Sequence, residues 1–365
     1  MTRYDRQTIL DGVGIEGQEA LTKSRVLCVG AGGLGSPVLL YLAAAGVGTL
    51  GIMDDDRVAE SNLQRQVLFP ESALGKSKVS AAKTEIQARH PKLLCLAYEY
   101  ALTSENALEL ISQYDLVIDG TDQFAAKFLI NDACTRLGIP WVYASVNQWE
   151  GQIASFFSKE GPCFRCFRPR APVSYVGNCS ESGVLGATVG IIGSWQALHA
   201  LRILLPRLEP EWGALQIVNT RSAEQLKVQI QKNPACPTCS LNAEEIVIED
   251  LENPICETNL KSALKLRSPE LLRNYSSFQA IDVRTVEEWN QGHLPQALHW
   301  PLSELEKNHF PSAQLSKIER QGKRPVLYCQ GGVRSARAAS LLSGEGYDGI
   351  MELQDGLLSW SGPLE

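Results

Sequence analysis

Four cysteines form two pairs with the spacing of metal-binding knuckles. The first pair is Cys163-Phe-Arg-Cys166 and the second is Cys236-Pro-Thr-Cys239. Each pair can offer two thiolates to one tetrahedral ion, and zinc is the usual ion for four cysteines. The 69 residues between the pairs exceed what a small zinc ribbon uses, so we predict a structural zinc ion that clamps one domain. A redox Cys-x-x-Cys or unliganded cysteines are the alternatives.

A fifth cysteine, Cys329, lies in a sequence that favours anionic sulfur. Cys329-Gln-Gly-Gly-Val-Arg334 follows a strand-like run and leads into a helical pattern. Successive backbone N–H groups, the helix N-terminus and Arg334 all favour negative charge on the cysteine sulfur, which could then carry a persulfide. The loop spans six residues, whereas Cys-dependent phosphatases place five residues between Cys and Arg. This length favours sulfur transfer over phosphatase chemistry.

A glycine-rich loop near the N-terminus has the context of a nucleotide-binding loop. Four glycines open a helical pattern after a strand-like run: Gly30, Gly32, Gly33 and Gly35. Glycines in this context let the backbone approach phosphates at a helix N-terminus. Asp54 ends the next strand-like run, 24 residues after Gly30, and can accept hydrogen bonds from a ribose. The pattern predicts an adenine nucleotide, either ATP or NAD, with tight packing as the alternative.

The polar residues that follow separate ATP chemistry from hydride transfer. They come in a fixed order along the chain: Asn62, Arg65, Gln66, Lys78 and Asp122. An attack on the α-phosphate of ATP develops charge on the triphosphate and uses Mg²⁺, so it needs cations and a carboxylate in one cleft. Hydride transfer needs neither. Each residue alone could be a solvated surface charge, but the ordered set predicts ATP.

Two α/β domains must position these residues, and the first shows a clear alternation of strands and helices. Strand-like runs over 25–30, 49–54 and 115–119 alternate with helical patterns such as 35–45. This alternation predicts a Rossmann-like domain of α/β class, with a mainly parallel sheet covered by helices on both faces.

A change in amino-acid composition marks the boundary between the two domains. Near residue 233 the sequence turns to Pro, Cys and acidic residues without periodicity. We predict an N-terminal domain over 1–245, a linker over 246–257 and a small α/β domain over 258–365.

Composition excludes several classes of protein. The chain has 365 residues, 44% hydrophobic and 21% charged, which is typical of a globular protein. With a net charge of −7 and no basic half, we expect no nucleic-acid partner. The charged N-terminus lacks a signal sequence, and the polar residues within the apolar stretch 183–201 exclude a membrane span. We therefore expect a cytoplasmic protein without membrane contact, whose cysteines serve metal or sulfur chemistry.

Residues 3–245 resemble the adenylating domain of the ubiquitin-activating-enzyme-like family. The resemblance rests on these motifs: Arg3-Tyr-Asp-Arg6-Gln, Val29-Gly-Ala-Gly-Gly-Leu-Gly35, Ser61-Asn-Leu-Gln-Arg-Gln66, Gly75-Lys-Ser-Lys78-Val and Asp119-Gly-Thr-Asp122. The most similar members are bacterial enzymes that activate sulfur-carrier proteins for molybdopterin and thiamine synthesis. One departure is Asp55, where similar proteins often carry an apolar or aromatic residue, and we expect little effect from it.

This resemblance implies an adenylyltransferase that uses ATP and Mg²⁺. It implies that six residues contact ATP: Gly33, Asp54, Asn62, Arg65, Gln66 and Lys78. Asp122 would serve the metal and the adenylate. Arg6 would reach into the site of a partner subunit, which implies a homodimer. The zinc site would be structural, with no open coordination position.

Residues 258–365 resemble rhodanese-like sulfurtransferases. Besides the Cys329 loop, two runs match: Ala280-Ile-Asp282-Val-Arg284-Thr-Val-Glu287-Glu-Trp289 and Gly292-His-Leu-Pro295-Gln-Ala297. The resemblance implies a persulfide on Cys329. An inactive fold used for docking is the alternative, and the intact Cys329 argues against it.

Cys179 lies in a glycine-rich segment before the apolar stretch. The matching position in the adenylating family carries a cysteine on a crossover loop, which in some members bonds to the activated carrier or its sulfur. The resemblance thus implies a chemical role for Cys179, with a buried inert thiol as the alternative. Three other cysteines are expected to be buried and unreactive: Cys28, Cys95 and Cys134.

These inferences combine into one expected function. ATP adenylates the C-terminal Gly-Gly carboxylate of a ubiquitin-like sulfur-carrier protein, with Arg6, Arg65 and Lys78 stabilising phosphate charge. A persulfide on Cys329, loaded by a cysteine desulfurase or thiosulfate, then attacks the acyl-adenylate, and Cys179 or another thiol releases a thiocarboxylate. The alternatives are an NAD-dependent oxidoreductase with a rhodanese accessory and a non-catalytic scaffold. The sequence leaves the pathway open among molybdenum cofactor (molybdopterin), thiamine, cysteine and tRNA thiolation.

Overall fold

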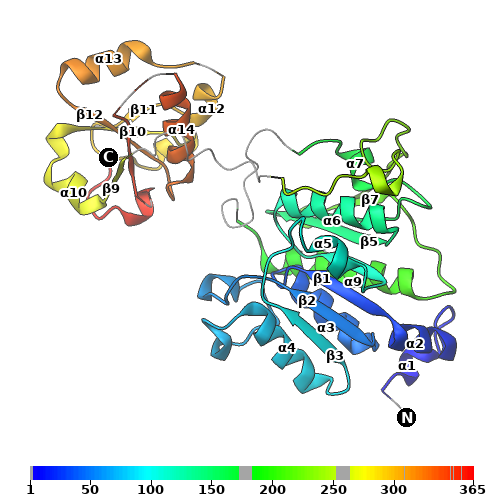
Figure 1. Ribbon diagram of the computed structural model, residues 1–365. Coiled ribbons are helices and arrows are strands. Elements are labelled where there is room, and N and C mark those ends of the chain that lie inside the picture. The colour runs from blue at the N-terminus through cyan, green and yellow to red at the C-terminus, as the bar shows by residue number, and fades with distance from the viewer. Residues whose placement is uncertain are drawn as a thin grey trace. The chain divides into compact units, whose positions relative to one another are not determined.

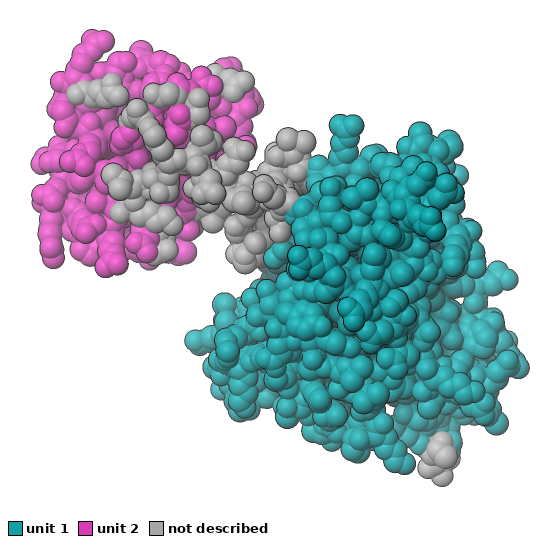
Figure 2. Space-filling view, in the orientation of Figure 1, with its two compact units in different colours: residues 1–253 teal, residues 254–365 magenta. Residues whose placement is uncertain are grey.

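The chain folds into two compact units, residues 1–253 and 254–365 (Figure 2). The computed structural model describes residues 3–171, 183–251, 264–307, 309–345, 347, 349–354 and 356–365. Each unit has its own sheet and its own hydrophobic core.

Unit 1 is built on an eight-stranded sheet in the order β3-β2-β1-β4-β5-β6-β7-β8 (Figure 1). The strands are β1 (Arg25–Val29), β2 (Thr49–Met53), β3 (Leu94–Tyr98), β4 (Leu116–Asp119), β5 (Trp141–Asn147), β6 (Glu150–Phe156), β7 (Ala214–Asn219) and β8 (Glu224–Gln229). The strands from β3 to β5 are parallel, and β5 to β8 pair antiparallel. The predicted α/β fold with a mainly parallel sheet is confirmed.

Helices cover both faces of this sheet. They are α1 (Asp5–Thr8), α2 (Gly14–Lys23), α3 (Gly35–Ala45), α4 (Lys78–Arg89), α5 (Ala107–Ile111), α6 (Phe124–Leu137), α7 (Phe164–Phe167) and α9 (Gly186–Leu204). In β1, Val26 and Cys28 share a core with α3, α4 and α9, whereas Leu27 and Val29 share one with α5 and α6. Because both of its faces are buried, β1 is apolar throughout.

Helix α9 contains most of the long uncharged stretch of the sequence, and it packs against α3 and β5. Its polar side chains bond to the interior. Gln196 Nε2 donates to the Asp119 carbonyl at 2.8 Å, and His199 Nδ1 lies 2.8 Å from Ser155 Oγ. No helix in the described part of the chain is both long and apolar enough to cross a membrane.

The buried His199 is expected to make the stability of unit 1 depend on pH. Burial, aided by the charge of Arg202, lowers the pKa of His199 from 6.5 to about 4. Between these values the unfolded chain binds a proton that the folded chain does not. The contribution of the neutral imidazole to stability is therefore complete above pH 6.5. The free energy of unfolding then falls as the pH drops toward 4, by up to ~1.4 kcal/mol per pH unit.

Thermal unfolding across this pH range tests the assignment. We expect His199→Gln to flatten the fall of Tm with pH, whereas His309→Gln, which removes an exposed histidine, should leave the slope unchanged. Equal slopes in the wild type and His199→Gln would contradict the assignment.

The first residues of the expected linker pack on unit 1. Ile246 is buried, and its carbonyl accepts a hydrogen bond from Arg136 Nη1 at 3.1 Å. Asp250 accepts hydrogen bonds from the amide and the hydroxyl of Ser104, at 2.9 and 2.7 Å. Residues 246–251 therefore lie against the first unit instead of spanning between two.

Unit 2 has a five-stranded parallel sheet in the order β11-β10-β12-β13-β9. Its elements are β9 (Leu264–Leu266), α10 (Ser268–Arg273), β10 (Phe278–Asp282), α11 (Val286–Asn290), β11 (Leu298–His299), α12 (Leu302–Leu305), α13 (Ser312–Arg320), β12 (Arg324–Tyr328), α14 (Val333–Gly344) and β13 (Met351–Leu353). The central strand β12 is buried on both faces, with Leu327 in one core and Val326 and Tyr328 in the other. This strand leads directly into the Cys329 loop.

Candidate functional site

The glycine loop after β1 packs directly on the loop after β4. Gly30 has a φ of 93°, a left-handed conformation that glycine adopts without strain. A Cβ on Gly30 would lie 2.7 Å from the carbonyl carbon of Gly120, so no larger residue fits. The strand order reverses between β1 and β4, and open α/β sheets bind ligands beyond the carboxyl ends of their strands at such a point.

A cavity of about 540 Å³ opens there, a size that suits a nucleotide. It is lined by most of the residues that the sequence assigned to ATP: Gly30, Gly32, Gly33, Asp54, Asn62, Arg65, Gln66, Lys78 and Asp122. Gly35 does not line it. A Cβ on Gly35 would lie 2.2 Å from the Gly30 carbonyl oxygen, so this glycine serves the close packing at the start of α3. Arg6 is exposed on α1 and does not line the cavity either.

Lys78 is a buried cation held between two carboxylates. Its Nζ lies 2.7 Å from Asp56 Oδ2 and 3.8 Å from Asp54 Oδ1. Asp54 also accepts hydrogen bonds from the amides of Ala31, at 2.8 Å, and Asp56, at 2.9 Å. Burial raises the pKa of Asp54, and the charge of Lys78 opposes that shift. These bonds fix the Asp54 carboxylate beside the glycine loop, where a ribose hydroxyl can share its lone pairs.

Two features of the cavity wall fit a nucleotide. Gln66 is buried, yet its Oε1 has no hydrogen-bond partner among the described residues. A donor on a ligand would satisfy this oxygen. At Gly32 the nearest atom to an added Cβ is Gln66 Nε2, at 3.7 Å. Packing within the chain therefore does not require glycine at this position, whereas close approach of a phosphate to the backbone does.

A buried ion pair behind the cavity was missed by the sequence analysis. Lys127 Nζ lies 2.7 Å from Asp119 Oδ2 and donates to the carbonyls of Thr121 and Ala144, both at 2.9 Å. Asp119 also accepts hydrogen bonds from the amide and hydroxyl of Thr121. The pair thus fixes the loop that presents Asp122 to the cavity. The available signal was a single lysine in the otherwise apolar start of α6.

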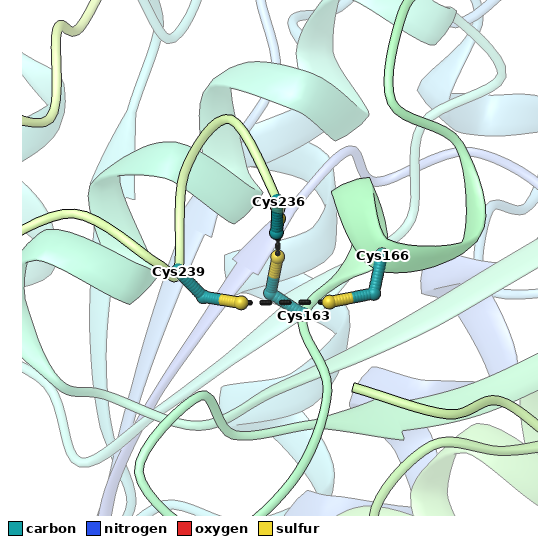
Figure 3. Close-up of side chains that lie close together, drawn as sticks. All are labelled: Cys163, Cys166, Cys236 and Cys239. Atoms are coloured by element: carbon teal, nitrogen blue, oxygen red, sulfur yellow. Dashed lines mark hydrogen bonds between the residues drawn. The ribbon is translucent and has the colours of Figure 1, made fainter. Parts of the chain in front are cut away.

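The four predicted metal ligands come together from two distant segments (Figure 3). The Sγ atoms of Cys163 and Cys236 are 3.5 Å apart, and those of Cys166 and Cys239 are 3.4 Å apart. All four sulfurs lie within 4.8 Å of one another. Ligands of a tetrahedral zinc ion with Zn–S bonds of about 2.3 Å are separated by about 3.8 Å, so the cluster fits that ion.

Helix α6 supports both knuckles through one aspartate. Asp132 accepts a bidentate pair of bonds from Arg165, the shortest at 2.6 Å, and a bond from Thr238 Oγ1 at 3.1 Å. Its neighbour Asn131 accepts a bond from the Phe164 amide at 2.8 Å. Each knuckle thus has a side chain or amide bonded to α6. Sequence spacing identified the sulfurs but not this supporting network.

Cys329 lies at the carboxyl end of β12, almost fully buried. The amide of Gly332 donates to its Sγ at 3.2 Å, and Ser335 Oγ lies 3.7 Å from the same sulfur. Gly332 has a φ of 90°, which turns the loop and aims this amide at the sulfur. The predicted backbone donor is therefore in place at the start of α14.

Arg334 is held by a carboxylate that the sequence analysis did not single out. Its Nη1 and Nη2 lie 2.6 and 2.7 Å from the two carboxylate oxygens of Glu288 on α11. This pairing, and to a smaller extent the Cys329 sulfur, raises the pKa of Arg334. Arg334 in turn lowers the pKa of Glu288 to about 2. The cation expected at the sulfur is thus partly neutralised by its partner.

The other cysteines divide into two groups. Cys28, Cys95 and Cys134 are buried, and burial raises the pKa of each thiol, to about 11 for Cys95. Their burial is as predicted, and a raised pKa leaves little of the nucleophilic thiolate at neutral pH. Cys179 lies outside the described residues.

The fold, the nucleotide-sized cavity of unit 1 and the Cys329 loop of unit 2 define an adenylating α/β domain followed by a rhodanese-like unit. The chain belongs to the ThiF family, whose model matches residues 4–238, and residues 268–363 match the rhodanese-like domain. The probable adenylyltransferase/sulfurtransferase MoeZ of Mycobacterium tuberculosis is 35% identical over 376 residues, covering 100% of this chain and 94% of that protein.

Two further similar proteins each match about two thirds of this chain. The sulfur carrier protein adenylyltransferase of Thermus thermophilus is 43% identical over 258 residues, covering 69% of this chain and 95% of that protein. Among solved structures, E. coli MccB with MccA-N7isoASN has a TM-score of 0.59 at 20% identity, covering 66% of this chain and 74% of that chain. This last likeness concerns the fold.

Proposed function

We propose that this chain uses ATP to activate the C-terminal carboxylate of a ubiquitin-like sulfur-carrier protein, and then converts that carboxylate into a thiocarboxylate. The chain is an enzyme of the adenylyltransferase and sulfurtransferase class, since it contains a ThiF domain and a rhodanese-like domain and its full-length relative MoeZ is named for both activities. The observation that carries the proposal is the single cavity around which the glycine loop, Lys78 and Asp122 meet.

The first step joins AMP to an acyl oxygen. The carrier's carboxylate oxygen attacks the α-phosphorus of ATP, the bond to the bridging oxygen breaks, and pyrophosphate leaves. Arg65 and Lys78 line the cavity and would stabilise charge on the phosphates. Asp122 would hold Mg²⁺, which neutralises phosphate charge when bound. The carboxylate thereby gains AMP as a leaving group.

The second step transfers sulfur from unit 2. The terminal sulfur of a Cys329 persulfide attacks the acyl carbon, AMP leaves, and an acyl disulfide joins the carrier to Cys329. A second thiol, which we assign to Cys179, attacks the Cys329 sulfur. This attack breaks the S–S bond, releases the thiocarboxylate and leaves a disulfide for a cellular thiol to reduce. A cysteine desulfurase or thiosulfate would supply the persulfide sulfur.

Carrier-dependent exchange of labelled pyrophosphate into ATP tests the first step. We expect exchange only with a β-grasp carrier that ends in Gly-Gly. Absence of exchange with every such carrier would overturn the proposal.

We also propose that the protein is located in the cytoplasm. None of the described cysteines forms a disulfide, which fits a reducing compartment.

We propose that the four cysteines hold a structural Zn²⁺. Cys236→Ser together with Cys239→Ser removes two ligands, so we expect loss of zinc and a fall in the Tm of unit 1 by roughly 10 °C or more. Sulfur transfer from thiosulfate to cyanide should stay near wild type, because unit 2 holds none of the ligands.

Elemental analysis and thermal unfolding measure these outcomes. Cys95→Ser is the control, since it removes a buried thiol outside the cluster. An unchanged Tm in the double variant would contradict the structural role of the metal.

We also propose a homodimer in which Arg6 serves the partner's cavity. Arg6 does not line the cavity of its own chain. An exposed apolar groove between α3 and α9 offers a surface for a second copy, and Tyr41, Ile191 and Leu198 on it are each at least half exposed.

Mixed dimers test this arrangement. Arg6→Ala and Lys78→Ala should each be inactive alone in pyrophosphate exchange. After subunit mixing they should recover about a quarter of wild-type activity, because half of the dimers then contain one complete site. No recovery in proven mixed dimers would show that Arg6 acts within its own chain, and full activity of Arg6→Ala alone would show that Arg6 is not used.

A further inference from the structure

Arg168 brings an additional cation to the wall of the nucleotide cavity. It follows the knuckle helix α7 directly, and its amide donates to the Phe164 carbonyl at 2.8 Å. Its side chain lines the cavity. The residue therefore reaches the cavity from the zinc knuckle, and not from the segments that carry the glycine loop, Arg65 and Lys78.

The Arg168 guanidinium is held by aromatic rings and not by a carboxylate. Its Cζ lies 5.4 Å from the ring centroid of Phe124 and 5.2 Å from that of Phe167. Its Nε is buried and has no hydrogen-bond partner among the described residues. The nearby Arg165 differs, because Asp132 pairs with it. No described carboxylate lies within ion-pair distance of Arg168.

Five carboxylates line the cavity, and none of these described groups lies within ion-pair distance of Arg168. Asp54 and Asp56 both form ion pairs with Lys78. The cavity wall from β5 and β6 contributes the Glu150 carboxylate, which accepts a hydrogen bond from Gln152 Nε2 at 3.2 Å. It also contributes neutral polar groups, including Tyr143, whose hydroxyl donates to Gln152 Oε1 at 3.3 Å. Burial raises the pKa of Tyr143 to about 12, and the charge of Arg168 opposes that shift, which indicates that the cation faces this wall. Because no described carboxylate pairs with Arg168, an anionic group of a ligand can bind to it.

We propose that Arg168 binds the C-terminal carboxylate of the carrier and positions it for attack on ATP. This inference rests on the proposed function. A planar guanidinium held between two rings matches a carboxylate with two parallel hydrogen bonds. The triphosphate has its own cradle at the glycine loop, with Arg65 and Lys78, so a second anion site from a different wall suits the second substrate.

Carrier-dependent pyrophosphate exchange by the zinc-loaded, full-length protein tests this assignment. We expect Arg168→Gln to raise the KM for the carrier about tenfold or more, with the KM for ATP nearly unchanged, and Arg168→Lys to restore part of the loss. Arg170→Gln is the matched control, because it removes the same charge two residues away from an exposed position outside the cavity. Its KM values should equal those of the wild type.

Binding of the carrier in two forms gives a readout besides activity. In the presence of a non-hydrolysable ATP analogue, the wild type should bind a carrier with a free C-terminal carboxylate more tightly than one with a C-terminal amide. Arg168→Gln should lose this preference while keeping its zinc, measured by elemental analysis. If Arg168→Gln loses its zinc, Arg168→Met is the second variant to test, because its side chain keeps the apolar contact with the aromatic rings. We expect Arg168→Met to show the same loss of preference for the free carboxylate.

The outcomes separate this inference from the function on which it rests. If the wild type shows no carrier-dependent exchange, the proposed function fails. If the wild type exchanges but Arg168→Gln keeps its carrier KM and its preference for the carboxylate, the inference alone fails. A rise in the KM for ATP without a change for the carrier would assign Arg168 to the triphosphate and would also overturn the inference.

Discussion

Cys329→Ser is expected to abolish thiocarboxylate formation, by at least ~10³-fold, while carrier adenylation continues at the wild-type rate. Serine cannot carry a persulfide, although it fits beside the Gly332 amide that donates to the sulfur. The adenylating cavity is lined entirely by unit 1, so the first step does not use this side chain. Mass spectrometry of the carrier, with thiosulfate as donor, distinguishes carboxylate, adenylate and thiocarboxylate.

The neighbouring Gln330→Ala is the matched control for this variant. Gln330 lies on the same loop with an exposed side chain, so its truncation changes the loop but keeps the sulfur. We expect thiocarboxylate yields within about twofold of wild type. Thiocarboxylate formed by Cys329→Ser at the normal rate would place the sulfur nucleophile elsewhere in the protein.

Lys78→Ala is expected to reduce carrier-dependent pyrophosphate exchange by about 10²- to 10³-fold. The substitution removes a buried cation from the cavity and leaves the carboxylates of Asp54 and Asp56 without their partner. Negative charge then faces the triphosphate where a positive charge had stabilised it. Exchange kinetics with varied ATP and carrier measure the loss.

Lys76→Ala provides the comparison for the loss at Lys78. Lys76 precedes it by two residues, is exposed and does not line the cavity. Its removal should leave exchange within about threefold of wild type. Both variants should transfer sulfur from thiosulfate to cyanide normally, because this reaction uses the Cys329 loop of unit 2. An equal loss in both would mean that general electrostatics, and not the position of Lys78, controls the reaction.

Together these two substitutions divide the reaction between the units. The Cys329 variant should accumulate adenylated carrier, and the Lys78 variant should make none while keeping rhodanese-type activity. If either variant lost both activities with its fold intact, the division of labour between the two units would be wrong.

Motifs that depend on a special backbone conformation or on a fixed spacing were predictable. Glycine is required at two positions of the nucleotide-binding loop for local reasons. A left-handed turn at Gly30 and a close approach at the start of the helix at Gly35 both exclude other side chains. The two Cys-x-x-Cys pairs and the Cys329 loop are similarly local. Each motif was recognisable because its residues are adjacent in the chain, although only the fold brings the two Cys-x-x-Cys pairs together.

Supporting residues that are distant in sequence were not predictable. Lys127 reaches the loop after β4 because α6 packs on the sheet beside β4 and β5. Glu288 meets Arg334 across 46 residues, and Asp132 joins two knuckles that lie in different segments. Each pairing depends on how helices pack, and a charged residue on a helix looks the same in sequence whether it faces solvent or a buried partner.

The sequence by itself determined the order of α/β elements, the motifs of both units and the four cysteines of the proposed zinc site, because hydrophobic periodicity and fixed spacings are local properties. The tertiary structure decided which charges are paired and which face the cavity: Lys78 is held by Asp54 and Asp56, whereas Arg168 has no described carboxylate beside it. The physical reason is that pairing depends on distance in space and on burial, and both are set only when the sheet and its helices have packed.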